Sequence, residues 1–128
     1  MLDHVTLSVA DFDVAKAFYK TALAPLGVAV LAESGPERGG GAGFAGFGAG
    51  GRAFFWIGSG KTPTGGAHVA FVAASRAEVD AFHAAALAVG ARDNGPPGLR
   101  PRYHRDYYGA FVLDPEGNNI EAVCRKPE

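Results

Sequence analysis

The sequence predicts an α+β fold made from two copies of one unit, and an internal repeat is the first observation behind this prediction. At a spacing of 64 residues, His4 aligns with His68 and Phe18 with Phe82. The second observation is that each copy shows the same order of patterns: a strand, a helix and two or three further strands. A repeat of this length is typical of duplicated supersecondary units packed against each other. We expect the units to span residues 1–62 and 63–128 of one domain.

The first copy opens with alternating residues and continues with a helical pattern. Residues 3–9 place apolar side chains on one face, as a half-buried strand does. Asp11 or Asp13 can cap the helix that follows. Residues 28–33 and 53–57 read as further strands. The expected apolar stripe of the helix comprises Val14, Ala17, Phe18, Ala22 and Leu23.

The second copy follows the same plan. Residues 67–73 read as a strand, and Ser75 with Glu78 forms a capping box that opens a helix. Residues 107–113 and 118–124 then predict a hairpin across the turn 114–117. Between the helix and the hairpin we expect a proline-rich loop containing Pro96, Pro97 and Pro101.

Three glycine-rich stretches imitate nucleotide-binding motifs. Residues 41–46 and 46–51 both fit GxGxxG, but neither opens a helix, as phosphate binding at a helix N-terminus requires. Residues 58–62 resemble the end of a P-loop without its first glycine. We expect strand and loop here, with no nucleotide site.

Composition excludes several function classes. The net charge is −1, with 12 basic and 13 acidic residues and no basic stripe, so nucleic acid is not an expected partner. The single cysteine, Cys124, cannot form an internal disulfide. Because neither a signal peptide nor a membrane-spanning stretch is evident, we expect a cytoplasmic location without membrane partners.

The repeat also places histidines that could bind a metal ion. His4 and His68 hold equivalent positions on the first strand of each copy. Glu121, on the final strand, offers a carboxylate that would complete a two-His-one-Glu set. Such a set with open positions suits Fe(II), Mn(II), Zn(II) or Ni(II). Taken singly, each histidine is better explained as a hydrogen-bonded strand residue, and it is their equivalence in the repeat together with Glu121 that favours metal binding.

At these residues the chain resembles the vicinal oxygen chelate superfamily of glyoxalase I, extradiol dioxygenases, fosfomycin-resistance enzymes and bleomycin-resistance proteins. The resemblance covers nearly the whole chain and rests on residues 3–5, 67–71 and 108–121. It implies two βαβββ modules, a curved mixed sheet with an open concave pocket, and a divalent metal that chelates substrate through two neighbouring oxygens. His4, His68 and Glu121 match the family's ligand positions.

One departure from glyoxalase I bears on the reaction. Residues 53–57 correspond to the strand that carries its fourth ligand, a glutamate, yet they contain no carboxylate. Isomerisation of a hemithioacetal is therefore not the expected reaction. Phe55 and Trp56, beside Phe54, would instead form an aromatic substrate-binding wall.

A polar and aromatic cluster precedes the predicted hairpin. Tyr108 or His104 would contact a metal-bound substrate oxygen, and Tyr108 is preferred because it begins the strand beside Glu121. Arg102, Arg105 and Tyr107 are the accompanying substrate-binding candidates. The favoured interpretation of the cluster as a whole is nevertheless a polar loop whose aromatic side chains anchor it to the rest of the protein.

The sequence therefore predicts a metal-dependent lyase, isomerase or dioxygenase-like enzyme acting on a small molecule, in a homodimer. A fosfomycin-type transferase is less favoured because its wider signature is not evident. A metal-free binding protein of the bleomycin-resistance type is the main alternative, and an interaction protein is the third. The site can lie within one chain or be shared across a swapped dimer.

Overall fold

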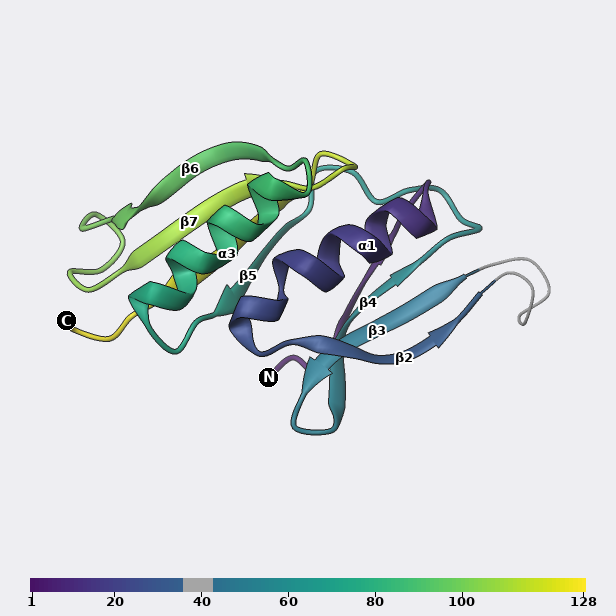
Figure 1. The fold of residues 1–128 in the computed structure, drawn as a ribbon, viewed down its shortest axis with the longest axis horizontal. Helices are drawn as coiled ribbons and strands as arrows, with labels where there is room; N and C mark the ends of the chain where they lie inside the picture. Colours follow the sequence, from purple (N-terminus) through teal and green to yellow (C-terminus); the bar gives the residue numbers. More distant parts are fainter. Residues whose placement is uncertain (36–42) are drawn as a thin grey trace.

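The computed structural model describes residues 1–35 and 43–128, and it shows two four-stranded sheets side by side along the long axis (Figure 1). Each sheet carries one long helix. The helices α1 and α3 contact each other and lie on the same side of the molecule.

The first sheet has the strand order β1-β4-β3-β2. Strands β1 and β4 pair in parallel, and the other pairs are antiparallel. The elements of this unit are β1 (Val5–Ser8), α1 (Phe12–Ala22), the short 3-10 helix η1 (Ala24–Leu26), β2 (Ala29–Ser34), β3 (Phe44–Ala49) and β4 (Arg52–Gly58).

The second sheet repeats this arrangement with the order β5-β8-β7-β6. Strands β5 and β8 are parallel, and β7 is antiparallel to both neighbours. The elements are β5 (His68–Val72), α3 (Arg76–Ala88), β6 (Arg92–Leu99), β7 (Tyr108–Leu113) and β8 (Asn119–Cys124). The α+β fold of two βαβββ units is thus confirmed.

Both helices begin at residues that the sequence identified. The Asp11 side chain accepts a hydrogen bond from the amide of Val14, and the Ser75 hydroxyl accepts one from the amide of Glu78. The Glu78 carboxylate in turn accepts from the amide of Ala74. These bonds satisfy amides that have no partner within the helix.

The buried stripe of α1 differs from the predicted one. Val14 is 49% exposed, while Ala15 and Tyr19 are buried. Phe18 and Ala22 are buried as expected, and Ala17 is exposed. The stripe is rotated because Tyr19 reaches a buried carboxylate beneath the helix, which the apolar pattern does not reveal.

The predicted proline-rich loop is wrong for Pro96 and Pro97, which lie within β6. Strand β6 is an edge strand, so a proline there need not supply a hydrogen bond to a second neighbour. Its pairing with β7 shifts register around Gly95, whose φ is 151°. Of the three glycine-rich stretches, residues 41–42 lie outside the described residues, whereas 44–49 form β3, as a strand interpretation requires.

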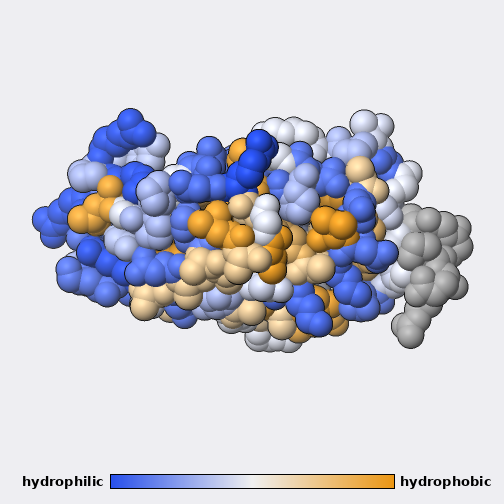
Figure 2. Space-filling model, turned by 45° about the horizontal axis from the view of Figure 1, so that its top comes forward, coloured by the Kyte–Doolittle hydropathy of each residue, from blue (hydrophilic) through white to orange (hydrophobic). Residues whose placement is uncertain are grey.

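Each helix covers one face of its sheet and leaves the other face open. Alternate residues of β4 and β8, such as Phe55 and Ile120, point into the core under the helices. The intervening residues lie on the open faces. Exposed apolar side chains include Leu2, Phe44 and Val72. On the face seen in Figure 2, which is turned from the helix-covered side seen in Figure 1, apolar residues gather midway along the molecule. In the described ranges, no helix is long and apolar enough to span a membrane.

A buried polar network joins the two units. The Tyr19 hydroxyl of α1 donates to the Asp114 carboxylate in the β7–β8 turn. The same carboxylate accepts hydrogen bonds from the side-chain and backbone nitrogens of Asn118. The Asn118 side-chain oxygen accepts from the amide of Ala67, just before β5. Burial and the neighbouring Asp114 carboxylate raise the pKa of Tyr19, so the hydroxyl keeps its proton and remains a donor.

We expect Tyr19→Phe to lower the free energy of unfolding by about 1.5–3 kcal/mol, since it removes a hydrogen bond to a buried charged acceptor. Urea unfolding would measure the change. The matched control is Tyr103→Phe, which removes the same atom from an exposed residue and should cost less than about 0.5 kcal/mol. Equal losses in the two variants would contradict a special role for the Tyr19–Asp114 bond.

Candidate metal and substrate site

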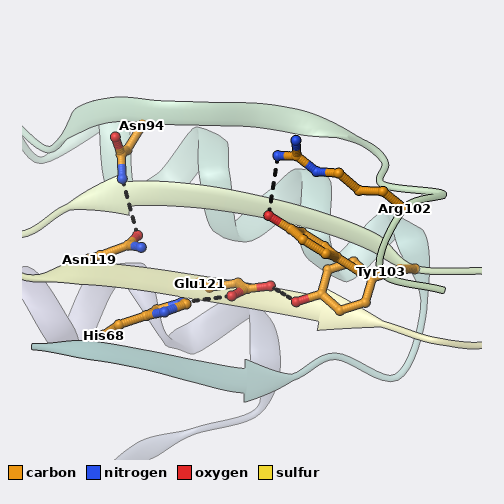
Figure 3. A network of polar contacts seen from close by, with 7 residues as sticks. His68, Asn94, Arg102, Tyr103, Asn119 and Glu121 are labelled. Atoms are coloured by element: carbon orange, nitrogen blue, oxygen red, sulfur yellow. Dashed lines mark hydrogen bonds and ion pairs between the residues drawn. The ribbon is translucent and has the colours of Figure 1, made fainter.

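Glu121 is a buried carboxylate held by two side chains from neighbouring segments. It lies in β8 and is 1% exposed. One of its oxygens, Oε1, is 2.8 Å from Nε2 of His68 in β5. The other oxygen, Oε2, accepts a hydrogen bond from the Tyr107 hydroxyl. Figure 3 shows His68 and Glu121 pointing toward each other across adjacent strands.

The register of the second sheet places these groups on its open face. His68 is paired with Asn119 and Ala70 with Glu121, so His68 and Glu121 point to the same side. Phe111 in β7 stands opposite Glu121. Tyr107, just before β7, continues the alternation that contains Phe111.

Gly109 makes room for the contact between Tyr107 and Glu121. A Cβ at this position would lie 3.1 Å from Cε1 of Tyr107 and 3.4 Å from Oε2 of Glu121. Any side chain larger than hydrogen would therefore crowd the tyrosine ring against the carboxylate.

An open cavity of about 430 Å³ lies over this arrangement. Its walls combine the two polar groups with aromatic rings and one cation. The lining residues are His68, Tyr103, Tyr107, Phe111, Glu121 and Arg125.

Burial and the hydrogen bond to Glu121 raise the pKa of Tyr107 to about 12. The hydroxyl is therefore protonated at neutral pH and acts as a donor to the carboxylate. Glu121 is left with both oxygens oriented, one by Tyr107 and one by His68.

The geometry of His68 and Glu121 fits a first-row divalent cation. Metal–nitrogen and metal–oxygen bonds of about 2.0–2.2 Å place ligand atoms that meet at about a right angle, as in octahedral coordination, about 3 Å apart. The separation of 2.8 Å between Nε2 and Oε1 is close to this value. Imidazole nitrogen and carboxylate oxygen are also the donor types that such cations bind.

His4 lies apart from this pair. Its Nδ1 is 2.8 Å from the Asp3 carboxylate, and it lines a different cavity, with residues of β1, β4 and β5. Among the described residues of the single chain, no three histidine, cysteine, aspartate or glutamate side chains gather as a metal site. One chain thus unites two members of the expected ligand set, while His4 remains exposed.

The other expected catalytic candidates lie outside the cavity lining. The Tyr108 hydroxyl donates to Asp80 of α3, on the helix-covered face. His104 lies in the loop before β7, where its Nδ1 accepts from the amide of Asp106.

The substrate-binding candidates divide between several places. Tyr107 lines the cavity, whereas Arg105 points to solvent beside Asp106. Arg102 reaches the Tyr103 hydroxyl at 3.3 Å (Figure 3). Phe55 is buried in the core, and Trp56 packs near Phe44 on the open face of the first sheet.

Sequence reasoning missed Tyr103, Phe111 and Arg125 as lining residues. Arg125 follows β8 on the alternation of Glu121 and Val123, and this parity was the signal available in the sequence. Tyr103 is in an irregular turn, where periodicity gives no direction.

Comparisons with known proteins agree on one family. A family model described as Glyoxalase/Bleomycin resistance protein/Dioxygenase superfamily matches residues 1–122. No curated protein matches the chain.

Several solved structures share the fold. A glyoxalase/bleomycin resistance protein from Albidiferax ferrireducens T118 is 31% identical, with 99% of each chain covered and a TM-score of 0.75. A mutant of the fosfomycin resistance protein FosX from Listeria monocytogenes, complexed with Mn(II) and 1S,2S-dihydroxypropylphosphonic acid, is 21% identical. That match covers 96% of this chain and 88% of FosX, with a TM-score of 0.67. Glyoxalase I from Zea mays is 19% identical over 99% of this chain and 45% of its own, with a TM-score of 0.71.

The Tyr107–Glu121 bond predicts a pH-dependent contribution to stability. The folded protein holds the phenol proton more tightly than the unfolded chain, whose tyrosines ionise near pH 10. This contribution is complete below about pH 10 and is lost as the pH rises toward the folded pKa of about 12. We expect Tyr107→Phe to be less stable than the wild type by about 1.5–3 kcal/mol near pH 8. Urea unfolding should show this gap narrowing above about pH 10, and a gap that stays constant would contradict the assignment.

Proposed function

Because the chain belongs to the Glyoxalase/Bleomycin resistance protein/Dioxygenase superfamily, we propose that it is a metal-dependent enzyme acting on a small substrate chelated through neighbouring oxygens. The observation that carries this proposal is the pair formed by His68 and Glu121, 2.8 Å apart at the wall of an open cavity. A bound divalent cation, Fe, Mn, Zn or Ni, would act there as a Lewis acid on substrate oxygens.

The third ligand in this proposal is His4 of a second copy of the chain. His4 directly precedes β1, on the alternation that faces the open side of the first sheet, and its side chain is about half exposed. The open faces of both sheets lack a covering layer of helices in the described structure. A homodimer that lays the first sheet of one copy over the second sheet of the other would cover both faces and unite the three ligands.

The remaining cavity residues have supporting roles. Tyr107 holds Oε2 of Glu121, which orients the carboxylate and leaves Oε1 directed at the His68 nitrogen. Phe111 and Tyr103 form apolar walls that restrict water around the bound substrate. Tyr108 and His104 have no catalytic role in this proposal, since neither lines the cavity.

The reaction class follows from what the site offers. Strand β4 carries no carboxylate, so a fourth ligand like that expected in glyoxalase I is missing from this strand. We therefore favour lyase, isomerase or dioxygenase-like chemistry with a three-ligand site over hemithioacetal isomerisation.

Metal binding is the direct test. We expect the wild type to bind Mn²⁺ with one site per chain in calorimetric titration. Removing one ligand from a three-ligand site, as in His68→Ala or Glu121→Gln, should weaken binding at least about 100-fold. His104→Ala removes an exposed histidine outside the cavity and should bind as the wild type does. Unchanged binding in His68→Ala would contradict the proposed site.

Mixing two variants that are each expected to lose tight metal binding tests whether the site is shared between two chains. Homodimers of His4→Ala and of His68→Ala each lack a complete ligand set. In a heterodimer, the intact His4 of one chain meets the intact His68 of the other, and random mixing restores about one quarter of the sites. We expect this fraction of tight Mn²⁺ binding to return after the two variants are unfolded and refolded together. A site formed within one chain would give no recovery.

A second cavity supports an alternative function, metal-free binding of an apolar molecule. It measures about 470 Å³ and is lined mainly by apolar side chains between β1, β4 and β5, including Leu2, Phe54 and Val69. Ligand capture there would be unaffected by chelation. The metal titration therefore distinguishes the two functions.

A further inference from the structure

We propose that the cavity beside Glu121 takes substrates that carry an anionic group, held at a rim of arginines away from the metal ligands. This inference rests on the proposed function, because it concerns the substrate of the same site. The rim consists of Arg100, Arg102 and Arg125.

The three aromatic rings that line the cavity each carry one of these guanidinium groups. Arg125 lies 4.9 Å from the centroid of the Tyr107 ring. Arg102 lies 5.1 Å from that of Tyr103, and Arg100 lies 5.5 Å from that of Phe111. Stacking on a ring holds the planar guanidinium in place without neutralising its charge.

Carboxylates do not neutralise the rim. In residues 1–35 and 43–128, none of the three arginines forms a salt bridge. One nitrogen of the Arg100 guanidinium already has a hydrogen-bond partner, since its Nη2 donates to the carbonyl of Pro96. The pKa of Asp93 is lowered chiefly by its hydrogen bond with His83, with a smaller contribution from Arg100. Arg102 and Arg125, both exposed, are therefore the main cations available to a ligand.

Glu121 does not cancel this preference for an anion. Its side chain is 2% exposed, and its oxygens are bonded to His68 and Tyr107. Both carboxylate oxygens thus already have partners, whereas the three guanidinium groups lie close to the aromatic rings of the cavity wall. The cations are therefore more accessible to a ligand than the carboxylate is.

The arrangement defines a substrate class. Two neighbouring oxygens would face His68 and Glu121, an apolar or aromatic body would contact Tyr103 and Phe111, and a carboxylate or phosphonate would reach the rim. Guanidinium groups bind both anions in bidentate fashion. Neutral substrates of the same shape would lack this last contact.

The test compares probes that differ in charge and match in shape. We would titrate Mn²⁺-loaded wild type with 3,4-dihydroxybenzoate and with its neutral amide, and metal-free protein with benzoate and benzamide. We expect the anion to bind at least about tenfold more tightly than the amide in each pair. The preference should decline as salt is added, because the rim is exposed.

Substitutions in the rim test whether its arginines cause the preference for an anion over the neutral amide. Arg125→Gln and Arg102→Gln should each reduce the anion preference several-fold, and Arg125→Lys should retain most of it because the charge remains. The matched control is Arg92→Gln, at the opposite end of β6 from Arg100, which should leave the preference unchanged.

The outcomes separate the two proposals. Equal binding of anion and amide by the wild type in both pairs, or an unchanged preference in both rim variants, would overturn the anionic rim. An anion preference that persists while Mn²⁺ fails to bind would support the rim and contradict the metal-dependent function alone.

Discussion

The carboxylate of Asp114 is the constraint on which the arrangement of the two units depends. It is 4% exposed and accepts four hydrogen bonds, from the Tyr19 hydroxyl, the Glu116 amide and two nitrogens of Asn118. A buried charge without such partners would be strongly destabilising. Because Asn118 also holds the amide of Ala67, one carboxylate ties α1 to the β7–β8 turn and to the start of β5. Glu121 follows Asn118 by three residues, so the same network fixes the position of the candidate site.

The internal repeat predicted the fold closely. It also contained strand bounds that local sequence patterns did not reveal. Adding 64 to the bounds of β3 (Phe44–Ala49) gives 108–113, the bounds of β7. Adding 64 to β2 (Ala29–Ser34) gives 93–98, within β6 (Arg92–Leu99). The repeat therefore contained the strand that Pro96 and Pro97 seemed to exclude. The low propensity of proline for β-strands was outweighed because β6 lies at a sheet edge, where proline is tolerated.

The site was harder to predict because a hairpin register decides which side chains face it. With the turn limited to residues 114–117, Leu113 would pair with residue 118, and Tyr108 would share a face with Glu121. In the structure Leu113 pairs with Asn119, which moves Tyr107 and Phe111 to that face instead, while Arg125 shares the face of Glu121 in either register. A slip of one residue reverses every side chain of a strand. The pairing of His68 with Glu121 was within reach of the sequence. Within one chain His4 lies apart from them, and in the proposed site it would come from a second copy.

The prolines of β6 have a consequence for the behaviour of this protein at high concentration. An uncovered strand at the end of a sheet can recruit the same strand from another molecule and start a growing cross-β stack. Pro96 and Pro97 offer no amide hydrogen there, and the irregular pairing around Gly95 distorts the outer edge further. Growth of the sheet in this direction is thereby blocked. Association through the open faces, as in the proposed dimer, would by contrast close after two copies and would not continue into a fibril.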